Sequence, residues 1–393
     1  MPKQKLIFIN THPIQYFAPL YQAIEKDGYF DLEVWYGTKH GLEGEIDQQF
    51  GTSVKWDIPI LEGYKHKFLK NNAWKPGLYN GFWGIMNLSI WNELRQLPKK
   101  SIVVIHGWTP FTAIYTILCC KLQGHMTCLR AESPLVHETG RSKRSLIMRT
   151  IFLKHFLFKF IDRFLYIGKQ NRLFYLHYGV KEPQLIFTPY AVNNARFQQQ
   201  AKELLPKKEE LRKELGIPLS NQVILYSGKL ISKKRPLDLL KAFSQLPIDI
   251  NAFLVFVGDG ELRKELETFI NEYSIKNVLI TGFINQSQIP KYYAIADVFV
   301  MCSDVGETWG LSTNEAMNFG LPIVISDRTG NYSDLVDGNG FVFETGNIED
   351  LLSKITPILK LNPHGVSLFK EKSLEKIKGY SYNIIVENLK LIN

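Results

Sequence analysis

Two glutamates, Glu307 and Glu315, stand with seven residues between them in the stretch 306–320. The spacing predicts that Glu307 lies in a loop and Glu315 in the first turn of the following helix, so that both carboxylates face a ligand docked at the helix N-terminus. This geometry suits a nucleotide sugar. The alternative is that Ser312 and Glu315, which have the Ser-x-x-Glu order of a capping box, only start the helix, while Glu307 is a solvated loop acid.

The residues around the two glutamates predict a strand, loop, helix and strand in succession. Residues 296–303 and 320–326 are short apolar runs typical of strands, and Gly320 is placed to stop the intervening helix. The acidic loop then follows the carboxyl end of a strand, which is where ligands of open parallel sheets bind. This context favours a binding site over the capping box alone.

A second group of chemically active residues follows another predicted strand. The apolar strand predicted over 222–228 ends at Gly228 and runs into the basic stretch 229–235. The glycine lets the backbone approach a ligand, and the cations can reach an anion held at the next helix N-terminus, for which a diphosphate is the obvious candidate. The alternative is a solvated charge cluster at 233–235, but cations at a helix start are unfavourable unless an anion lies nearby.

With these and further motifs, the C-terminal half resembles the retaining family-4 glycosyltransferases, similar to members involved in bacterial polysaccharide and glycolipid assembly. The motifs are, in chain order, 228–235, 255–261, 278–283, 293–300, the Glu307–Glu315 pair and 338–342. The resemblance implies an α/β protein of the GT-B fold, in which two Rossmann-like, doubly wound domains face a central cleft.

The resemblance also implies a donor site and a role for each of its residues. The implied contacts are Gly228, Lys229 and Lys234 at the donor diphosphate, the backbone of Gly310 and Leu311 at the phosphates, Glu307 at the donor sugar, Glu315 at the ribose and Phe283 at the base. Two positions depart from the family pattern. Lys229 stands where arginine is usual, which loosens the phosphate geometry, and Thr308-Trp309 stands where Pro-Phe is common.

The N-terminal half is consistent with a second nucleotide-type domain. Residues 6–10 and 101–106 predict strands, the first leading to His12 and Gln15 on a loop expected to face the acceptor side of the cleft, and the second ending at His106 before a helix over 111–121. A lone histidine beside an apolar run is commonly a packed core residue. Because His106 terminates a strand at a glycine and matches the family's active-site histidine, we expect it to act at the donor sugar or the acceptor.

Two further stretches of this half, 50–59 and 61–64, resemble segments of polysaccharide-assembly members of the family. They are aromatic and rich in loop residues. The expectation is that they line an acceptor groove.

The implied reaction moves a hexose-type sugar from a nucleotide diphosphate donor to a glycan, glycolipid or lipid-linked acceptor, with retention at the anomeric carbon. Catalysis would rest on His106, Glu307, Lys229 and Lys234, with the fixed cations stabilising the departing diphosphate. No Asp-x-Asp pattern is present to hold a metal, so no metal or other cofactor is expected. The alternatives are a GT-B-like nucleotide-sugar epimerase and a non-catalytic protein that binds an anionic surface.

Length and composition indicate two domains. With 393 residues and a hydrophobic fraction of 45%, the chain exceeds what one core usually holds. The expected division is an acceptor-binding domain over 1–190, a nucleotide-sugar-binding domain over 191–367, and terminal helices over 368–393 that cross back onto the first domain. The polar run 198–213 predicts a linker and a first exposed helix.

The excess positive charge belongs to the N-terminal half. Residues 1–190 carry 24 Lys and Arg against 14 Asp and Glu, whereas the remaining residues carry 23 against 24. Much of the excess lies in 141–163, where basic residues interrupt an apolar, aromatic stretch. This segment predicts either a helix in an anionic lipid interface or a core helix whose basic side chains reach water.

Nothing in the sequence predicts a signal peptide or a membrane span, because no apolar run approaches about 20 residues. The four cysteines lack paired metal-ligand spacing and are expected to be reduced core residues; they are Cys119, Cys120, Cys128 and Cys302. We therefore expect a cytoplasmic protein, peripheral on the inner face of the membrane where 141–163 meets lipid. No nucleic-acid motif is apparent, and nucleic acid is not an expected partner.

Overall fold

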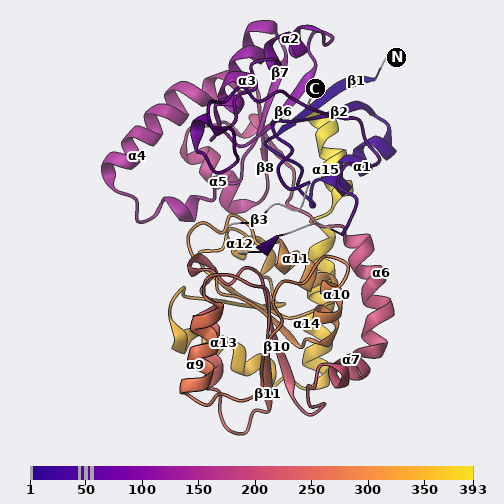
Figure 1. Cartoon of the computed structure of the whole chain (residues 1–393), viewed down its shortest axis with the longest axis vertical. Coiled ribbons are helices and arrows are strands. Elements are labelled where there is room, and N and C mark those ends of the chain that lie inside the picture. The colour runs from indigo at the N-terminus through magenta and orange to yellow at the C-terminus, as the bar shows by residue number, and fades with distance from the viewer. Residues whose placement is uncertain (1–2, 43–45, 48–51, 54–56, 393) are drawn as a thin grey trace. The chain divides into compact units, whose positions relative to one another are not determined.

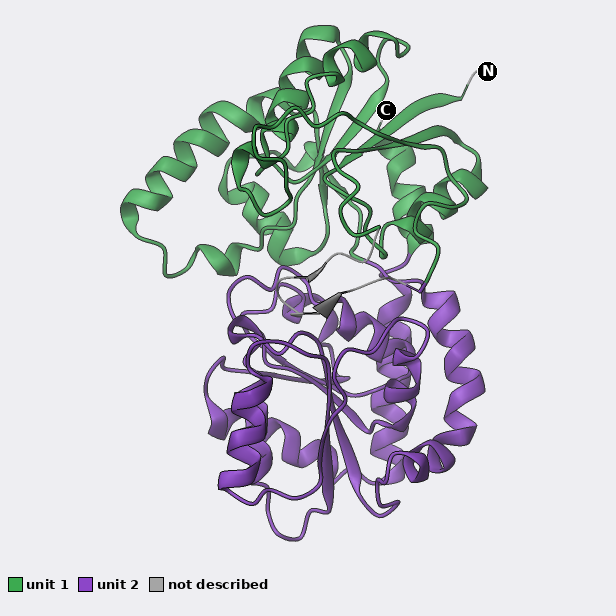
Figure 2. Ribbon diagram, viewed as in Figure 1, with its two compact units in different colours: residues 1–45, 58–190, 382–393 green, residues 46–57, 191–381 purple. Residues whose placement is uncertain are grey.

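The structure, a computed structural model, describes residues 3–42, 46–47, 52–53 and 57–392. The chain divides into two compact units, coloured separately in Figure 2. Unit 1 comprises residues 1–45, 58–190 and 382–393, and unit 2 comprises residues 46–57 and 191–381.

Unit 1 is built on a parallel sheet of seven strands in the order β5-β2-β1-β6-β7-β8-β9. Figure 1 labels β1, β2, β6, β7 and β8 of this sheet. The strands are β1 (Gln4–Asn10), β2 (Phe30–Tyr36), β5 (His66–Phe68), β6 (Ile102–His106), β7 (Met126–Arg130), β8 (Arg163–Tyr166) and β9 (Leu185–Phe187). Central strands are apolar along their length because helices cover both faces of such a sheet. In β6, residues 102–105 are at most 1% exposed.

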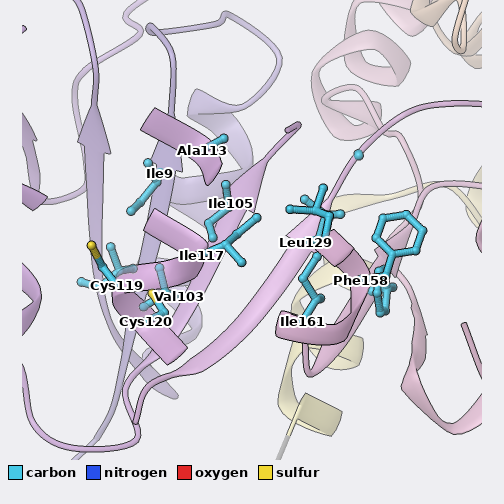
Figure 3. Close-up of a cluster of buried hydrophobic side chains, with 14 of the residues drawn as sticks. Ile9, Val103, Ile105, Ala113, Ile117, Cys119, Cys120, Leu129, Phe158 and Ile161 are labelled. Atoms are coloured by element: carbon cyan, nitrogen blue, oxygen red, sulfur yellow. The ribbon is translucent and has the colours of Figure 1, made fainter. Parts of the chain in front are cut away.

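The helices of unit 1 follow the strands in alternation. They are α1 (Ala18–Asp27), α2 (Ile90–Arg95), α3 (Phe111–Gln123), α4 (Lys143–Thr150), α5 (Lys169–His177) and α15 (Tyr382–Leu389). Figure 3 shows the core where α3 lies on β6, with Ala113 and Ile117 beside Val103 and Ile105. All four of these side chains are at most 3% exposed, so α3 is held to the sheet by apolar burial.

Unit 2 is built on a parallel sheet of six strands in the order β12-β11-β10-β13-β14-β15. The strands are β10 (Gln222–Ser227), β11 (Ala252–Val257), β12 (Val278–Ile280), β13 (Val298–Met301), β14 (Ile323–Ser326) and β15 (Gly340–Phe343). The helices are α6 (Asn194–Leu204), α7 (Lys208–Glu214), α8 (Pro236–Ser244), α9 (Arg263–Glu272), α10 (Ile289–Ile295), α11 (Leu311–Asn318), α12 (Tyr332–Leu335), α13 (Ile348–Leu359) and α14 (Pro363–Lys378). The chain also forms a short antiparallel pair, β3 (Ile46–Asp47) and β4 (Thr52–Ser53).

The segment 368–393, expected to cross back as one group of helices, is divided between the units. Most of α14 lies in it and belongs to unit 2, where the hydroxyl of Ser373 is fully buried and donates to the carbonyl of Leu321 at 2.8 Å. Only α15 and the residues after it belong to unit 1, where the side chain of Asn388 donates to the carbonyl of Phe187 at 2.7 Å. The expectation for α14 was therefore wrong.

The polar run 198–213, predicted as a linker with one exposed helix, instead belongs to two helices that pack on unit 2. The reason is a buried guanidinium, because Arg212 of α7 is 7% exposed. It donates to Asp297 at 2.6 Å and to the carbonyl of Ile295 at 2.7 Å. Arg212 therefore forms an internal ion pair, while most of the other polar side chains of this run, such as Lys202, Glu209 and Lys213, are exposed as predicted.

The direction of winding reverses once in each sheet. In unit 1 the chain leaves the neighbouring strands β1 and β6 toward opposite edges of the sheet, and in unit 2 it does the same from β10 and β13. Ligands of open parallel sheets bind outside the carboxyl ends of the strands at such a switch point. The predicted residues His12, Gln15 and His106 follow β1 and β6, while Lys229, Lys234 and Glu307 follow β10 and β13.

Candidate functional sites

The loop after β10 is held by close backbone packing against the loop after β11. A Cβ atom at Gly258 would lie 1.9 Å from the carbonyl oxygen of Gly228, and one at Gly260 would lie 2.5 Å from that of Leu230. The amide of Leu230 also donates to the carbonyl of Asp259 at 2.9 Å. The motif Val-Gly-Asp-Gly at 257–260 therefore fixes the backbone at Gly228 and Lys229. The side chain of Lys229 is partly exposed.

Lys234 and Glu307 meet as an ion pair at the switch point of unit 2. The ammonium of Lys234 donates to a carboxylate oxygen of Glu307, and the two side chains are 17% and 12% exposed. The loop that carries Glu307 is tied down on both sides. The amide of Asp304 donates to the carbonyl of Lys233 at 2.7 Å, and the amide of Gly330 donates to that of Glu307 at 3.0 Å.

The chain itself supplies anions near the start of α8. Arg235 pairs with Asp238 at 2.5 Å and with Asp304 at 3.2 Å, in addition to the pair between Lys234 and Glu307. An external anion is therefore not needed to offset two of the three cations at 233–235. The charge at the start of α8 therefore does not favour a diphosphate, whereas the position of these residues at the switch point does.

Glu315 is fixed inside unit 2, beyond the first turn of α11. The helix begins at Leu311 and is preceded by Gly310, so Glu315 is its fifth residue and the predicted first-turn position is wrong. Its carboxylate is 1% exposed and accepts a hydrogen bond from the hydroxyl of Tyr293 at 2.7 Å and from the amide of Gln286 at 3.4 Å.

The capping-box alternative is also wrong, because the residue before α11 is Gly310 and no side chain caps the helix. Gly310 adopts a φ of 84°, and a Cβ atom there would lie 2.5 Å from the sulfur of Met301. Only glycine fits this start of α11. Glu307 thus lies in an ion pair on a loop, whereas Glu315 is buried in a helix and hydrogen-bonded.

The remaining donor-site residues surround the same edge of the sheet. Leu311 is partly exposed at the start of α11, and Phe283 is partly exposed just after Gly282, which follows β12. Trp309, where the family commonly has phenylalanine, is 2% exposed, and its ring lies 5.6 Å from that of Tyr380. The departure at Trp309 is therefore accommodated by core packing.

In unit 1, His106 ends β6 with one nitrogen unpaired. Its Nε2 atom is buried and has no hydrogen-bond partner among the described residues. Its ring lies 4.5 Å from that of Phe17. Burial, with the nearby charge of Arg130, lowers the pKa of His106 well below its usual value. The imidazole is therefore neutral at pH 7 and can accept a hydrogen bond from a ligand hydroxyl.

His12 and Gln15 lie on the loop after β1. The side-chain oxygen of Gln15, a residue 6% exposed, is buried and has no partner within the described parts of the chain. Burial, with the neighbouring His40, lowers the pKa of His12 to about 4. Both side chains are neutral at pH 7, like that of His106.

Arg130 was missed by the sequence reasoning. It ends β7, in register with His106 on β6, and is 2% exposed. Its guanidinium carbon lies 5.3 Å from the ring centre of Phe17 and 5.0 Å from that of Tyr190. Two of its nitrogens, Nε and Nη1, are buried without a partner among the residues described. The signal available in the sequence was an arginine ending an apolar strand beside the strand of His106.

Of the two stretches expected to line an acceptor groove, only 61–64 is fully described. Much of 50–59 lies outside the described residues. In 61–64, Tyr64 is 8% exposed, and its hydroxyl lies 2.7 Å from that of Tyr36. Tyr64 is thus a core residue and does not line a groove.

The four cysteines are free and buried, and burial raises the pKa of each thiol. Within the ranges that the structure describes, no cluster of three or more His, Cys, Asp or Glu residues is arranged to hold a metal ion. In the same ranges no helix has the length and apolar character that crossing a bilayer requires.

A family model matches the C-terminal half of the chain, and solved structures match nearly its whole length. The family model described as glycosyl transferases group 1 matches residues 207–379. Spore coat protein SA of Bacillus subtilis is 30% identical over 193 residues, which is 46% of this chain and 51% of that protein. The chain spans about half or less of the length of the curated relatives it matches.

Two solved structures share the architecture. A glycosyltransferase from Rickettsia africae superposes with a TM-score of 0.74 at 16% identity, over 100% of this chain and 98% of that one. Anabaena Alr3699/HepE in complex with UDP and glucose superposes with a TM-score of 0.71 at 14% identity, over 98% of each chain. The protein therefore has the GT-B fold of two Rossmann-like domains, as predicted. The predicted resemblance to this group of glycosyltransferases is confirmed by the family match over 207–379.

Proposed function

We propose that the protein is a retaining, metal-independent glycosyltransferase that moves a hexose-type sugar from a nucleoside diphosphate to a glycan, glycolipid or lipid-linked acceptor. The observation that carries the proposal is the ion pair of Lys234 and Glu307 at the switch point of unit 2. A cation and an acid placed there match the two ends of a sugar diphosphate. The complex of HepE with UDP and glucose, a protein of the same fold, supports a uridine nucleotide as the first donor to test.

The ion pair suggests how the donor would enter. A diphosphate carries more negative charge than one carboxylate, so it would take over the ammonium of Lys234 and release Glu307 toward the sugar hydroxyls. Lys229 lies on the same fixed loop. The amide of Leu311, at the start of α11, would add a donor and the positive end of the helix dipole.

The proposed transfer needs no protein nucleophile. The bond between the anomeric carbon and the phosphate oxygen breaks, and the acceptor oxygen bonds to the same face of that carbon. The acceptor proton passes to the departing phosphate oxygen. Lys229 and Lys234 would stabilise the growing negative charge on the diphosphate, and the neutral imidazole of His106 would accept a hydrogen bond from a hydroxyl of the donor sugar or acceptor.

The donor site is tested by calorimetry with UDP, GDP, ADP and CDP and their common sugar derivatives. The variants are Lys234→Ala and Glu315→Gln, the latter keeping the shape of a buried side chain. Lys264→Ala, an exposed lysine on α9, is the matched control. One nucleotide that binds the wild type and the control, but binds both site variants weakly, supports the proposal. Equal binding to all four proteins, or to none, contradicts it.

The chemistry is tested separately with the nucleotide sugar that binds. The expected product is a glycoside with the donor's anomeric configuration, formed equally with or without a chelator. An altered sugar still attached to its nucleotide would replace the transferase with an epimerase. Loss of turnover in chelator, restored by magnesium or manganese, would overturn metal independence.

We also propose that the solvent-exposed face of α4 binds an anionic membrane. The sequence predicted either a lipid-facing helix or a core helix over 141–163, and different parts of the segment fit each prediction. Leu153 and Leu157, in the helical turns after α4, are buried in the core, whereas α4 itself has no buried residue. Ile147, Met148 and Ile151 are more than half exposed at helical spacing.

Cations stand on the same face of α4, one turn before these apolar side chains. Lys143 and Arg144 precede Ile147 and Met148 by four residues each, and both cations are exposed. Such a face suits lipid headgroups above an acyl boundary. Co-sedimentation with anionic vesicles at low salt is expected for the wild type, and it should be lost in the variant with Ile147, Met148 and Ile151 all changed to serine. Retention in that variant, or no sedimentation of the wild type, would contradict the proposal.

A further inference from the structure

Residues 69–89 join β5 to α2 and carry a concentration of exposed aromatic rings in unit 1. Trp74 is 94% exposed, Trp83 60%, Tyr79 47% and Phe82 38%. Apart from a single turn of 3-10 helix at Phe82–Gly84, the segment has no regular structure. Loops of more than about 12–15 residues with little secondary structure are uncommon in compact domains and usually serve a function.

The segment is held in one conformation by hydrogen bonds from two asparagine side chains, Asn71, which is partly buried, and Asn87, which is buried. Asn71 donates to the carbonyl of Gly84 at 3.0 Å, and its oxygen accepts from the amides of Ala73 at 3.0 Å and Met86 at 2.9 Å. Asn87 is fully buried and donates to the carbonyl of Lys70 at 3.0 Å. The exposed tryptophans therefore project from a fixed frame.

Glycine packing tightens the same frame. A Cβ atom at Gly84 would lie 2.3 Å from the carbonyl oxygen of Gly77, and the amide of Gly77 donates to the carbonyl of Gly84 at 3.0 Å. Between the two glycines, the side chain of Asn80 donates to the carbonyl of Lys75 at 3.2 Å. A frame built this closely around exposed indole rings points to a ligand that needs them in place.

Trp83 belongs both to a stacked series of aromatic rings and to the lining of a pocket. The ring of Trp83 lies 5.4 Å from that of Phe111 with 27° between the planes, and Phe111 lies 5.5 Å from Tyr115 with 16° between the planes. A pocket of about 490 Å³ opens at the outer end of the series and is lined by Trp74, Lys75, Asn80, Trp83 and Met86. This volume falls in the range of small-molecule sites, roughly 300–1,000 Å³.

The frame is attached to the carboxyl edge of the unit 1 sheet. Asn87 donates to the carbonyl of Gly37, the residue after β2, at 3.1 Å. The hydroxyl of Thr112, near the start of α3 after β6, donates to the carbonyl of Ile85 at 2.9 Å. The pocket thus belongs to the edge of the sheet that also carries His106, where ligands of parallel sheets bind.

We propose that residues 74–86 form a carbohydrate-binding subsite, in which a sugar ring lies on the indole faces of Trp74 and Trp83. A pyranose has a face of C–H groups and a rim of hydroxyl groups, so it needs a flat aromatic surface with polar groups beside it. The ammonium of Lys75 donates to the rim. The amide oxygen of Asn80, whose nitrogen is engaged with the backbone, accepts from it. This inference rests on the proposed function, because the bound ring would be part of the acceptor.

The chemistry of the pocket favours a glycan over a lipid. The face of α4 described above combines two cations with aliphatic side chains, as an anionic membrane requires. The pocket instead combines rigid indole rings with one ammonium and one amide. Its shape is set by hydrogen bonds and glycine packing rather than by side chains that adapt to acyl chains.

Fluorine NMR of protein labelled with 5-fluorotryptophan tests the subsite, because the chain has seven tryptophans and the signals of Trp74 and Trp83 are identified by substitution. The probes are maltohexaose, cellohexaose and chitohexaose, added without nucleotide. We expect at least one to shift the signals of Trp74 and Trp83 and no others. Its affinity should fall about tenfold or more in Trp74→Ala and Trp83→Ala and less in Trp83→Phe. Tyr273→Ala, which removes a 60% exposed ring from unit 2, is the matched control.

Three outcomes overturn the subsite. The first is that none of the three oligosaccharides shifts either signal. The second is that binding survives in the double variant Trp74→Ala, Trp83→Ala. The third is that neutral phosphatidylcholine vesicles, rather than glycans, shift both signals. Nucleotide calorimetry on the wild type reports separately on the proposed function. Glycan shifts without nucleotide binding would leave the subsite standing and remove the transferase, and the reverse would remove only the subsite.

Discussion

The switch points of the two sheets carry opposite kinds of chemistry. In unit 2, Lys234 and Glu307 neutralise one another, and the buried Glu315 is bonded by Tyr293 and Gln286. In unit 1, the corresponding place leaves buried polar atoms of His106, Gln15 and Arg130 without partners among the described residues. One site is satisfied by its own side chains, and the other is not.

This difference suggests how each site would treat a ligand. A satisfied ion pair must be opened, so the donor has to offer more charge than the carboxylate it displaces. An unsatisfied buried group costs about 1–3 kcal/mol until something bonds to it, so a neutral hydroxyl is enough to gain from binding there. Under the proposed function, the anionic diphosphate would bind in unit 2, and sugar hydroxyls would bond to His106 and Gln15 in unit 1.

The largest expected effect separates chemistry from donor affinity. His106→Asn should lower kcat about 10²–10³-fold, the loss seen when one preorganised hydrogen bond to the reacting groups is removed. The affinity for the free nucleoside diphosphate should change little, because the nucleotide contacts proposed here lie in unit 2. Steady-state kinetics and calorimetry measure the two quantities. A large fall in nucleotide affinity would break the division of labour between the switch points.

The second prediction concerns pH, and it belongs to unit 1. Folded His12 stays deprotonated down to a pKa of about 4, whereas the unfolded chain takes up that proton near 6.5. The unfolded state binds more protons between these values, so the free energy of unfolding falls as pH drops from 6.5 toward 4. The contribution is up to about 3 kcal/mol, and His106 acts in the same direction.

Urea unfolding at several pH values measures this slope in the wild type and in His12→Asn. The slope should decrease in His12→Asn. An unchanged slope in His12→Asn would mean that His12 is not held neutral by burial.

The strands at both switch points were predictable because their residues are continuous apolar runs. The predicted strand 222–228 contains β10, and 101–106 contains β6, so the places of Lys229 and His106 followed from chain order alone. Side-chain partners did not follow. The bond of Glu315 comes from Tyr293 on α10, and local spacing suggested a capping role that Gly310 takes instead.

For the same reason, the sequence did not predict which buried polar side chains have hydrogen-bond partners and which do not. The bond between Lys234 and Glu307 joins residues 73 positions apart. Arg130 and Tyr190 are also distant in the sequence, and only folding brings the guanidinium close to the tyrosine ring. Sequence periodicity reports which face of an element is buried, but not which polar atoms meet there. Burial of polar groups therefore had to be read from the structure.

The third prediction is that substitutions at the two sites change the free energy of unfolding in opposite directions. Arg130→Met replaces unpaired buried nitrogens with apolar atoms of similar length and should stabilise the protein by about 1 kcal/mol. Lys234→Met leaves Glu307 without its partner and should destabilise by about 1–2 kcal/mol. Urea midpoints at pH 7 measure both changes. Destabilisation by both substitutions would show that Arg130 is already satisfied, and the contrast between the units would fail.

The smallest expected effect tests whether Glu307 competes with the donor. Glu307→Gln keeps the shape of the side chain but removes the charge that occupies Lys234, so free UDP should bind up to about tenfold more tightly, equivalent to about 1.4 kcal/mol. The sugar-bearing donor should gain less, because its sugar loses the carboxylate. Asp304→Asn, which weakens the neighbouring pair with Arg235 instead, is the matched control. Weaker binding of UDP by Glu307→Gln would mean that the pair orders the loop rather than standing in for a phosphate.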